Sequence, residues 1–220
     1  KYLPMDNLSK HIAAIREDYI MNTLDEKDAG ADPVSFFKQW FQEAEHAAVT
    51  EVNAMTLATI NADGFPHARI VLLKGIENEQ FVFYTNYNSR KGQDLAQNAK
   101  VAVVFFWKEL QRQVRVEGTV QQVAASVSDE YFASRPYTSQ IGALVSPQST
   151  IIANRDVLED RLAALLKEYP EGSIVPRPQH WGGYAIQPTK IEFWQGRASR
   201  LHDRIVFERN DAAQWTKYRL

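Results

Sequence analysis

The sequence contains no cysteine, so disulfide bonds, thiolate nucleophiles and cysteine-ligated metals are all excluded. This absence fits a reducing compartment, and we expect a cytoplasmic protein. The histidines lie far apart in the chain and match no metal-ligand spacing: His11, His46, His67, His180 and His202. No metal site is therefore expected.

Long hydrophobic runs and an excess of charge of one sign are also missing. The longest wholly apolar run, Val101–Trp107, is too short to cross a bilayer, and no secretory signal is visible from Lys1 onward. The 25 basic and 27 acidic residues leave a net charge of −2, which gives no general field for nucleic acid or an anionic membrane. We expect neither as a partner, and any cationic site must be local.

The common nucleotide-binding loops are absent as well. No Gly-x-Gly-x-x-Gly fingerprint follows a strand and no Walker-type loop occurs, so a bound phosphate would be held by side chains and helix ends. The 220 residues are 45% hydrophobic and contain no internal repeat or low-complexity linker. This composition favours a single domain of ordinary core size.

The hydrophobic pattern that is present predicts helices at the start and in the middle of the chain, with strands between them and at the end. Helical spacing covers residues 8–19, 32–44 (with Asp32 as N-cap), 89–97, 129–134 and 154–168. Alternating or apolar segments predict strands at 54–60, 67–76, 81–86, 101–107, 112–123, 182–188, 190–196, 204–209 and 215–220, with turns at NADG and ENEQ. This order favours an α+β fold built on a small antiparallel barrel.

One helix start carries charges of the unfavourable sign. Ser89 is the expected N-cap, and Arg90 with Lys91 occupies the first turn, where the helix dipole favours negative charge. A bound anion would resolve the conflict, because backbone N–H groups and both cations would point at one phosphate. Alternatively, both side chains reach into solvent.

Two further cationic groups have similar ambiguity. Tyr131 and Arg135 share a helix face, Pro136 ends that helix, and Ser139 follows where the chain can fold back, so the three donors suit a phosphate or form ordinary surface stacking. In RIVLLK, Arg69 and Lys74 are five residues apart, which places them on opposite faces of a regular strand. They would then serve different ligands, or one of them is solvated.

The segment SRLHDRIVFE places three cationic or titratable side chains close together. If residues 199–208 are extended, Arg200, His202 and Arg204 project to one face. The same pattern suits a half-exposed strand with a solvated outer face.

Taken together, these segments resemble the pyridoxine (pyridoxamine) 5'-phosphate oxidase family from about residue 15 to 220. The motifs that carry the resemblance occur in family order: RIVLLK, FYTN with SRK, RQV, YFASRP with SQIGA, SPQS, EFWQG and RLHDR. The resemblance implies one FMN-binding domain over residues 1–220, a small antiparallel split β-barrel with flanking helices, in which residues 1–30 form a mobile N-terminal helical lid. It also implies a homodimer with FMN at the subunit interface.

The resemblance implies an activity and a set of site residues. Pyridoxine or pyridoxamine 5'-phosphate would be oxidised to pyridoxal 5'-phosphate with dioxygen as acceptor, a reaction that needs a cofactor and orientation but no protein nucleophile or metal. The FMN-binding positions would be Arg69, Ile70, Val71, Leu72, Leu73, Lys74, Tyr84, Thr85, Arg90, Lys91, Gln113, Gln148, Ser149, Trp194 and Arg204. The substrate-binding positions would be Arg16, Tyr19, Lys74, Tyr131, Arg135, Ser139, Arg200, Leu201 and His202. Among the latter, Arg200 and His202 would contact the pyridine ring and are the catalytic candidates.

Other functions fit parts of the same pattern. A flavin oxidase of another pathway, such as the phenazine type, would keep the FMN residues and take a different substrate, since fold alone does not fix function. A non-catalytic carrier of FMN or pyridoxal phosphate is a second alternative, which peroxide production on adding pyridoxamine phosphate would exclude. A nucleic-acid-binding barrel is a third, and the near-neutral charge disfavours it.

Overall fold

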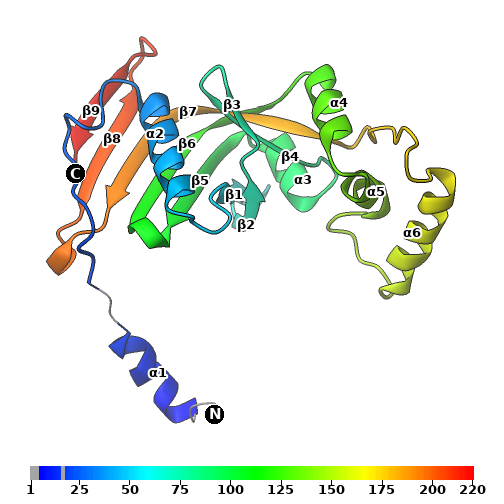
Figure 1. Ribbon diagram of the computed structural model, residues 1–220, viewed down its shortest axis with the longest axis horizontal. Coiled ribbons are helices and arrows are strands. Elements are labelled where there is room, and N and C mark those ends of the chain that lie inside the picture. The colour runs from blue at the N-terminus through cyan, green and yellow to red at the C-terminus, as the bar shows by residue number, and fades with distance from the viewer. Residues whose placement is uncertain (1–4, 16–17) are drawn as a thin grey trace.

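A single antiparallel sheet curls into a half-barrel at the centre of the molecule, with helices packed against it (Figure 1). The computed structural model describes residues 5–15 and 18–220. The strands run in the order β2-β1-β5-β6-β7-β4-β3, while β8 pairs with β7 and β9 pairs with β8. This arrangement confirms the predicted α+β class with an antiparallel barrel.

The elements follow the predicted order along the chain apart from the differences given below, and the first helix, predicted over residues 8–19, ends at Ala14. The strands are β1 (Ala54–Ile60), β2 (Pro66–Leu72), β3 (Gly75–Glu77), β4 (Gln80–Asn86), β5 (Lys100–Trp107), β6 (Arg112–Gln122), β7 (Trp181–Gln195), β8 (Asp203–Arg209) and β9 (Trp215–Arg219). The helices are α1 (Met5–Ala14), α2 (Pro33–His46), α3 (Arg90–Gln97), α4 (Ala125–Ser134), α5 (Tyr137–Val145) and α6 (Asp156–Glu168), with short 3₁₀ turns η1 (Lys108–Leu110) and η2 (Ala198–Arg200). None of the helices in the described ranges is long and apolar enough to cross a membrane.

Strand β7 connects two distant parts of the molecule. Its first half pairs with β4 and its second half with β8, while β6 pairs along most of its length. At about 3.3 Å per residue, the 15 residues span more than roughly 40 Å, so helices α4 to α6 at its start lie far from β8 and β9 at its end. The sequence predicted two separate strands here. The two predicted segments form one continuous strand, because a shift in the pairing register at Gly118 of β6 accommodates Pro188 in the middle of β7.

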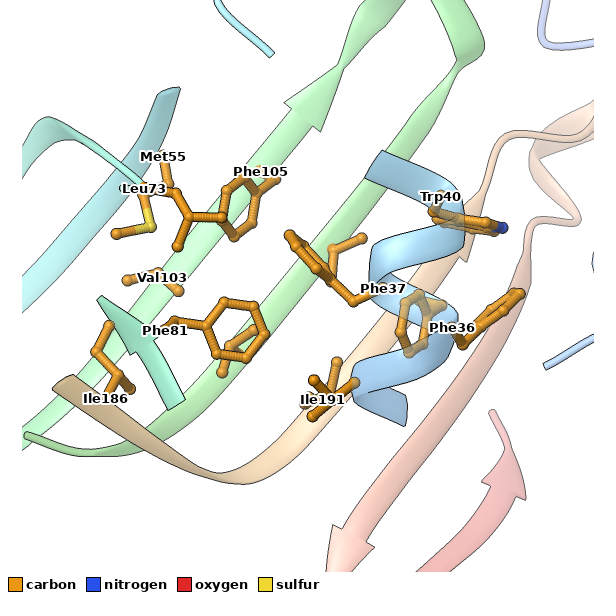
Figure 2. Packing of buried hydrophobic residues seen from close by; sticks show 14 of the residues in the cluster. Phe36, Phe37, Trp40, Met55, Leu73, Phe81, Val103, Phe105, Ile186 and Ile191 are labelled. Atoms are coloured by element: carbon orange, nitrogen blue, oxygen red, sulfur yellow. The ribbon is translucent and has the colours of Figure 1, made fainter. Parts of the chain in front are cut away.

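Helix α2 closes the main core over the sheet (Figure 2). Its start is fixed as predicted, because the Asp32 carboxylate accepts hydrogen bonds from the Val34 and Ser35 N–H groups at 3.0 and 3.1 Å. The Phe37 ring then packs 4.9 Å from Phe81 of β4 and 5.0 Å from Phe105 of β5, measured between ring centroids. The aromatic face of α2 therefore ties both halves of the half-barrel together.

A smaller hydrophobic cluster lies under α4, α5 and α6, separate from the main core. It contains Phe132, Ile141, Val145, Val175 and Trp181. Helix α5 was not predicted, because Pro136 was read only as the end of α4. Pro136 ends α4 and also begins α5, because its carbonyl oxygen accepts hydrogen bonds from the Ser139 and Gln140 N–H groups in the first turn of α5.

The strand predicted at residues 67–76 is divided. Strand β2 ends at Leu72, after which the Leu73 N–H donates to Asn53 O and the Lys74 N–H to Val82 O. The chain thus changes partner from β1 to β4. Arg69 and Lys74 were predicted to occupy opposite faces of one regular strand. This prediction is wrong, because Lys74 lies beyond the end of β2.

Candidate cofactor and substrate site

The first group of predicted site residues lines a cavity of about 600 Å³ at the start of β7, called pocket A here. Helices α3, α4 and α5 and strands β2 and β4 contribute its walls. The predicted residues in its lining are Ile70, Val71, Leu72, Lys74, Tyr84, Thr85, Lys91, Tyr131, Arg135, Ser139 and Gln148. The described residues that line pocket A include three cations and no carboxylate, so the pocket suits an anionic ligand.

Lys91 turns from the start of α3 back into pocket A. Its ammonium group donates to Thr85 Oγ1 at 3.1 Å, Ser89 Oγ at 3.2 Å and Gln148 Oε1 at 2.8 Å, all neutral oxygens. Burial, together with the nearby positive charge of Arg69, lowers the pKa of Lys91 to about 8. The predicted N-cap is confirmed, because Ser89 Oγ accepts the Gly92 N–H. An anion beside Lys91 would relieve the electrostatic cost of this cation.

The opposite wall of pocket A is a stack of aromatic rings under Arg135. The rings of Tyr84 and Tyr131 lie 3.8 Å apart and nearly parallel, and both are parallel to Trp181. The guanidinium carbon of Arg135 lies 4.5 Å from the Trp181 ring centroid. Its Nη1 atom is buried and has no hydrogen-bond partner in the described part of the chain. A buried charged donor without an acceptor is costly, so this atom points to a missing anionic partner.

The two tyrosines of this wall, which lie near Arg135, have raised pKa values. Burial raises the pKa of Tyr84 to about 12, with a smaller effect from nearby Glu77. Burial raises the pKa of Tyr131 above its usual value as well, although the charge of Arg135 opposes this. Both tyrosines therefore remain hydrogen-bond donors at neutral pH.

Arg69 and Arg90, two further predicted FMN residues, do not line pocket A. Arg90 is exposed at the first turn of α3. Arg69 lies behind the wall, where its guanidinium donates to Leu57 O at 3.1 Å and Thr59 Oγ1 at 2.7 Å and lies 3.7 Å from Asp94. Asp94 was not identified from the sequence, and its carboxylate also accepts from Thr59 at 2.7 Å. A helical aspartate gives no signal of what it faces until the tertiary fold is known.

The second group of predicted residues lines another cavity at the far end of β7, about 850 Å³ in volume and called pocket B here. Its lining is Ile15, Asp18, Tyr19, Trp194, Arg197, Ser199, Arg200 and His202. The His202 ring centroid is 4.6 Å from Trp194 and 5.6 Å from Tyr19. His202 Nδ1 lies 3.1 Å from the Arg197 N–H, which makes Nδ1 the acceptor, so the neutral ring carries its proton on Nε2. Arg16 lies outside the described residues.

The extended row predicted for Arg200, His202 and Arg204 does not form. Ser199 and Arg200 have φ values of 57° and 61° within η2, and β8 begins only at Asp203. Arg200 and His202 therefore belong to a loop that turns toward pocket B. Arg204 lies in β8, where its guanidinium donates to the buried Glu192 carboxylate at 3.2 and 2.9 Å. Leu201, also predicted, is 79% exposed.

Most of the described predicted site residues thus divide between two pockets that one chain cannot bring together, whereas Leu73 is buried in the main core and lines neither pocket. Gln113 pairs with Trp194 and belongs to the pocket B end, whereas Ser149 follows Gln148 of pocket A. Trp181 lines pocket A and Trp194 lines pocket B, and these two residues of β7 lie roughly 40 Å apart along the strand. A single site would require pocket B of a second copy to face pocket A. Trp181 was not identified from the sequence, because the two glycines that follow it give no alternating hydrophobic pattern to show that the strand begins there.

Comparison with protein families gives two matches that together cover most of the chain. A family described as pyridoxamine 5'-phosphate oxidase matches residues 41–167. A second, described as the pyridoxine 5'-phosphate oxidase C-terminal dimerisation region, matches residues 181–220.

Curated relatives are similar over nearly the full length. A pyridoxine/pyridoxamine 5'-phosphate oxidase from Leptospira interrogans is 58% identical over 209 residues, covering 95% of this chain and 97% of its own. Proteins of the same name from Cupriavidus necator and Cytophaga hutchinsonii are 53% and 51% identical, over 95% and 97% of this chain and 98% and 99% of their own.

Solved structures share the fold. PhzG from Burkholderia lata, solved with tetrahydrophenazine-1-carboxylic acid, has a TM-score of 0.85 at 28% identity and covers 91% of this chain and 98% of its own. An FMN-binding protein related to pyridoxamine 5'-phosphate oxidase from Nostoc punctiforme has a TM-score of 0.68 at 15% identity, over 84% of this chain and 96% of its own, which concerns the fold alone.

Proposed function

This chain belongs to the pyridoxamine 5'-phosphate oxidase family, and from that premise we propose that it is an FMN-dependent oxidase of pyridoxine or pyridoxamine 5'-phosphate. The products are pyridoxal 5'-phosphate and hydrogen peroxide, with ammonia released from the amine substrate. The observation that carries the proposal is pocket A, which combines three cations, no carboxylate among the described residues of its lining and a buried Arg135 Nη1 without a partner. A phosphate ester supplies the oxygen acceptors that these groups lack.

The residues of pocket A fit FMN as the cofactor. Lys91, at the start of α3, would bind the cofactor phosphate with support from Thr85 and Gln148, which already surround its ammonium group. The exposed apolar side chains of Ile70 and Leu72 on β2 would contact the flavin ring. FMN, when bound, would supply the two-electron acceptor for the substrate, with dioxygen as the final acceptor.

The substrate phosphate would lie beside Arg135. Tyr131 and Ser139 stand in the same wall and offer hydroxyl donors, and Lys74 adds a second positive charge. A phosphate held away from the reacting carbon supplies binding energy that can fix the pyridine ring against the cofactor. Arg200 and His202 would orient that ring, with His202 donating through Nε2 because its Nδ1 already accepts the Arg197 N–H.

The complete site requires a homodimer. Pockets A and B lie at opposite ends of β7, and the family match over residues 181–220 is to a dimerisation region. An apolar outer face of the half-barrel connects the two pockets: Ile70 at pocket A is 63% exposed, and Phe106, 54% exposed, pairs with Gln113 beside Trp194. Packing this face against its own copy by two-fold symmetry would bring each pocket A to the partner's pocket B.

The phenazine-type alternative is disfavoured by similarity. PhzG is 28% identical to this chain, whereas the oxidases are 50% identical or more over nearly the same span. The two functions share the fold and differ in the substrate. We expect no oxidation of a tetrahydrophenazine carboxylate at a rate comparable with that of pyridoxamine phosphate.

A spectroscopic assay tests the proposal. The purified protein is expected to be yellow with one FMN per subunit, to be bleached by pyridoxamine phosphate without oxygen and to release hydrogen peroxide when air is admitted. A coloured protein that is not bleached would be a carrier, and a protein that binds no FMN would contradict the proposal. The cytoplasmic location stays a prediction, which cell fractionation would test.

A further inference from the structure

The segment of residues 18–21 borders pocket B, and its residues Asp18 and Tyr19 are part of the pocket lining. The Tyr19 ring lies edge-on to Trp194 and His202, with centroids 5.6 Å from each. The ring rests on Gly196, where an added Cβ would lie 2.8 Å from Tyr19 Cγ, so no larger residue fits there without moving the ring. The place of Tyr19 in pocket B therefore depends on what holds the backbone around it.

Burial does not hold this segment. The next two side chains, Ile20 and Met21, are 77% and 52% exposed. Instead, one side chain binds the backbone on both sides of Tyr19. Gln111 Oε1 accepts the Ile20 N–H at 3.0 Å and the Met21 N–H at 3.3 Å, and Gln111 Nε2 donates to Asp18 O at 3.4 Å. A primary amide is required for this pattern, because it offers an acceptor and a donor together.

Gln111 is itself fixed to the sheet. It has φ 54° at the end of η1, and its carbonyl oxygen accepts the Gly196 N–H at 2.8 Å and Gln195 Nε2 at 3.2 Å. Gln195 is fully buried on β7, and its Oε1 accepts from Arg112 Nε at 2.9 Å. The attachment of residues 18–21 therefore leads directly into the core rather than to another surface loop.

We propose that Gln111 is a positioning residue that holds residues 18–21 beside pocket B and so keeps Tyr19 against Trp194 and His202. The inference rests on the proposed function for its effect on the substrate. Gln111 lines neither pocket A nor pocket B, so it would act on the substrate only through Tyr19. Its loss would release Tyr19, weaken substrate retention and leave FMN binding unchanged.

Two variants change the Gln111 side chain without disturbing its backbone conformation. Gln111→Gly removes the amide at a position where φ is positive, so the backbone conformation carries no penalty. Gln111→Asn keeps an amide and tolerates the same φ, but its side chain is one methylene too short to span all three contacts. Gln121→Ala, which changes an exposed glutamine on β6, the strand that follows Gln111, is the control.

Amide hydrogen exchange on the resting FMN-bound protein tests the attachment without turnover. We expect the Ile20 and Met21 amides to exchange at least about tenfold faster in Gln111→Gly, with Gln111→Asn intermediate and Gln121→Ala like wild type. Unchanged exchange at both amides would overturn the proposal. So would an equal acceleration across β6 and β7, because Gln111 would then be only a structural residue.

Steady-state kinetics give the second readout. Gln111→Gly should raise the KM for pyridoxamine phosphate about tenfold, with a smaller change in kcat and a full FMN content. A large fall in kcat with unchanged KM would contradict the positioning role. If wild-type protein produced no peroxide, the proposed function would fail, while the exchange experiment would still decide whether Gln111 holds the segment.

Discussion

At the scale of single residues, Lys91 is a buried cation whose titration should control cofactor binding. Burial and the charge of Arg69 lower its pKa to about 8, so the ammonium form dominates below that pH and the neutral amine above it. A phosphate ester is a dianion above a pH of about 6. It binds the ammonium form better, so FMN affinity is expected to fall as the pH rises through 8.

Fluorescence quenching of FMN by the apoprotein would measure this effect. Between pH 7 and 9.5 we expect the dissociation constant of wild type to increase about tenfold, the cost of losing one charge-assisted contact. Lys91→Met should bind FMN weakly and with little pH dependence. Lys167→Met, on the exposed face of α6, serves as the control and should follow wild type. A flat wild-type profile would show that Lys91 does not bind the phosphate.

Asp94 is a buried carboxylate behind pocket A with several donors. Burial alone raises its pKa, but hydrogen bonds from Thr59 and His67 and the charges of His67 and Arg69 outweigh burial and hold the pKa below its usual value. A carboxyl whose pKa is lowered by folding adds stability at pH values above its unfolded pKa of about 3.9. That contribution is lost as the pH falls through the lower, native pKa.

Urea unfolding of the apoprotein at several pH values checks this account. Asp94→Asn should lower the free energy of unfolding by about 1–3 kcal/mol at pH 7, because Arg69 is left without its charge partner. The difference from wild type should shrink as the pH approaches 3. Asp211→Asn, in an exposed turn, is expected to match wild type at every pH. An Asp94→Asn deficit that stayed constant down to pH 3 would assign the loss to packing rather than charge.

At the scale of elements, pocket A has two walls with different expected tasks. The start of α3 carries Lys91 for the cofactor phosphate, and the junction of α4 and α5 carries Arg135 for the substrate phosphate. The two cations should therefore give different defects when they are removed.

Flavin content and Michaelis constants distinguish the two walls. Arg135→Met should keep FMN and raise the KM for pyridoxamine phosphate by about tenfold to a hundredfold, whereas Lys91→Met should lose FMN on dilution. Arg155 precedes α6, and its exposed guanidinium donates to Glu159 of that helix. Arg155→Met should change neither quantity. Loss of FMN from Arg135→Met with normal substrate affinity would reverse the assignment.

Elements with local signals could be predicted from the sequence. Asp32 and Ser89 cap their helices as expected because the bonded N–H groups lie within three residues. The ENEQ turn formed because Asn78 and Glu79 adopt positive φ between two strands. Signals of this kind need no knowledge of the remaining chain.

Elements that depend on distant partners could not be predicted. Strand β2 ends at Leu72 because Val82 of β4 binds the next stretch of chain, and nothing in RIVLLK encodes that exchange. Likewise, the pattern around Arg200 suits a strand, but η2 turns the chain at Ser199 before β8 begins. Some residues of each pocket were predicted through the resemblance, such as Lys91 and Arg135 in pocket A and Tyr19 and His202 in pocket B. The distance between the pockets depends on the length of β7, which the sequence pattern divided into two strands.

At the scale of the whole molecule, the exposed apolar outer face predicts a dimer whose integrity the flavin requires. Phe106→Asp places a charge in that face, and analytical ultracentrifugation should show monomers that retain little FMN. Ile174→Asp changes an equally hydrophobic residue that is 93% exposed outside this face, and it should remain a yellow dimer. Monomeric Phe106→Asp protein with full FMN content would mean that one chain suffices for the cofactor.

The central claim is that each active site combines pocket A of one chain with pocket B of the other, and a mixed dimer tests it most directly. Arg135→Met impairs pocket A and Arg200→Met impairs pocket B, so each homodimer should have little activity at limiting substrate. A dimer with one chain of each kind, isolated through two affinity tags, would carry one doubly altered site and one intact site. The account predicts about half of the wild-type activity per mixed dimer. A mixed dimer no more active than its parents would contradict it, because each site would then lie within one chain.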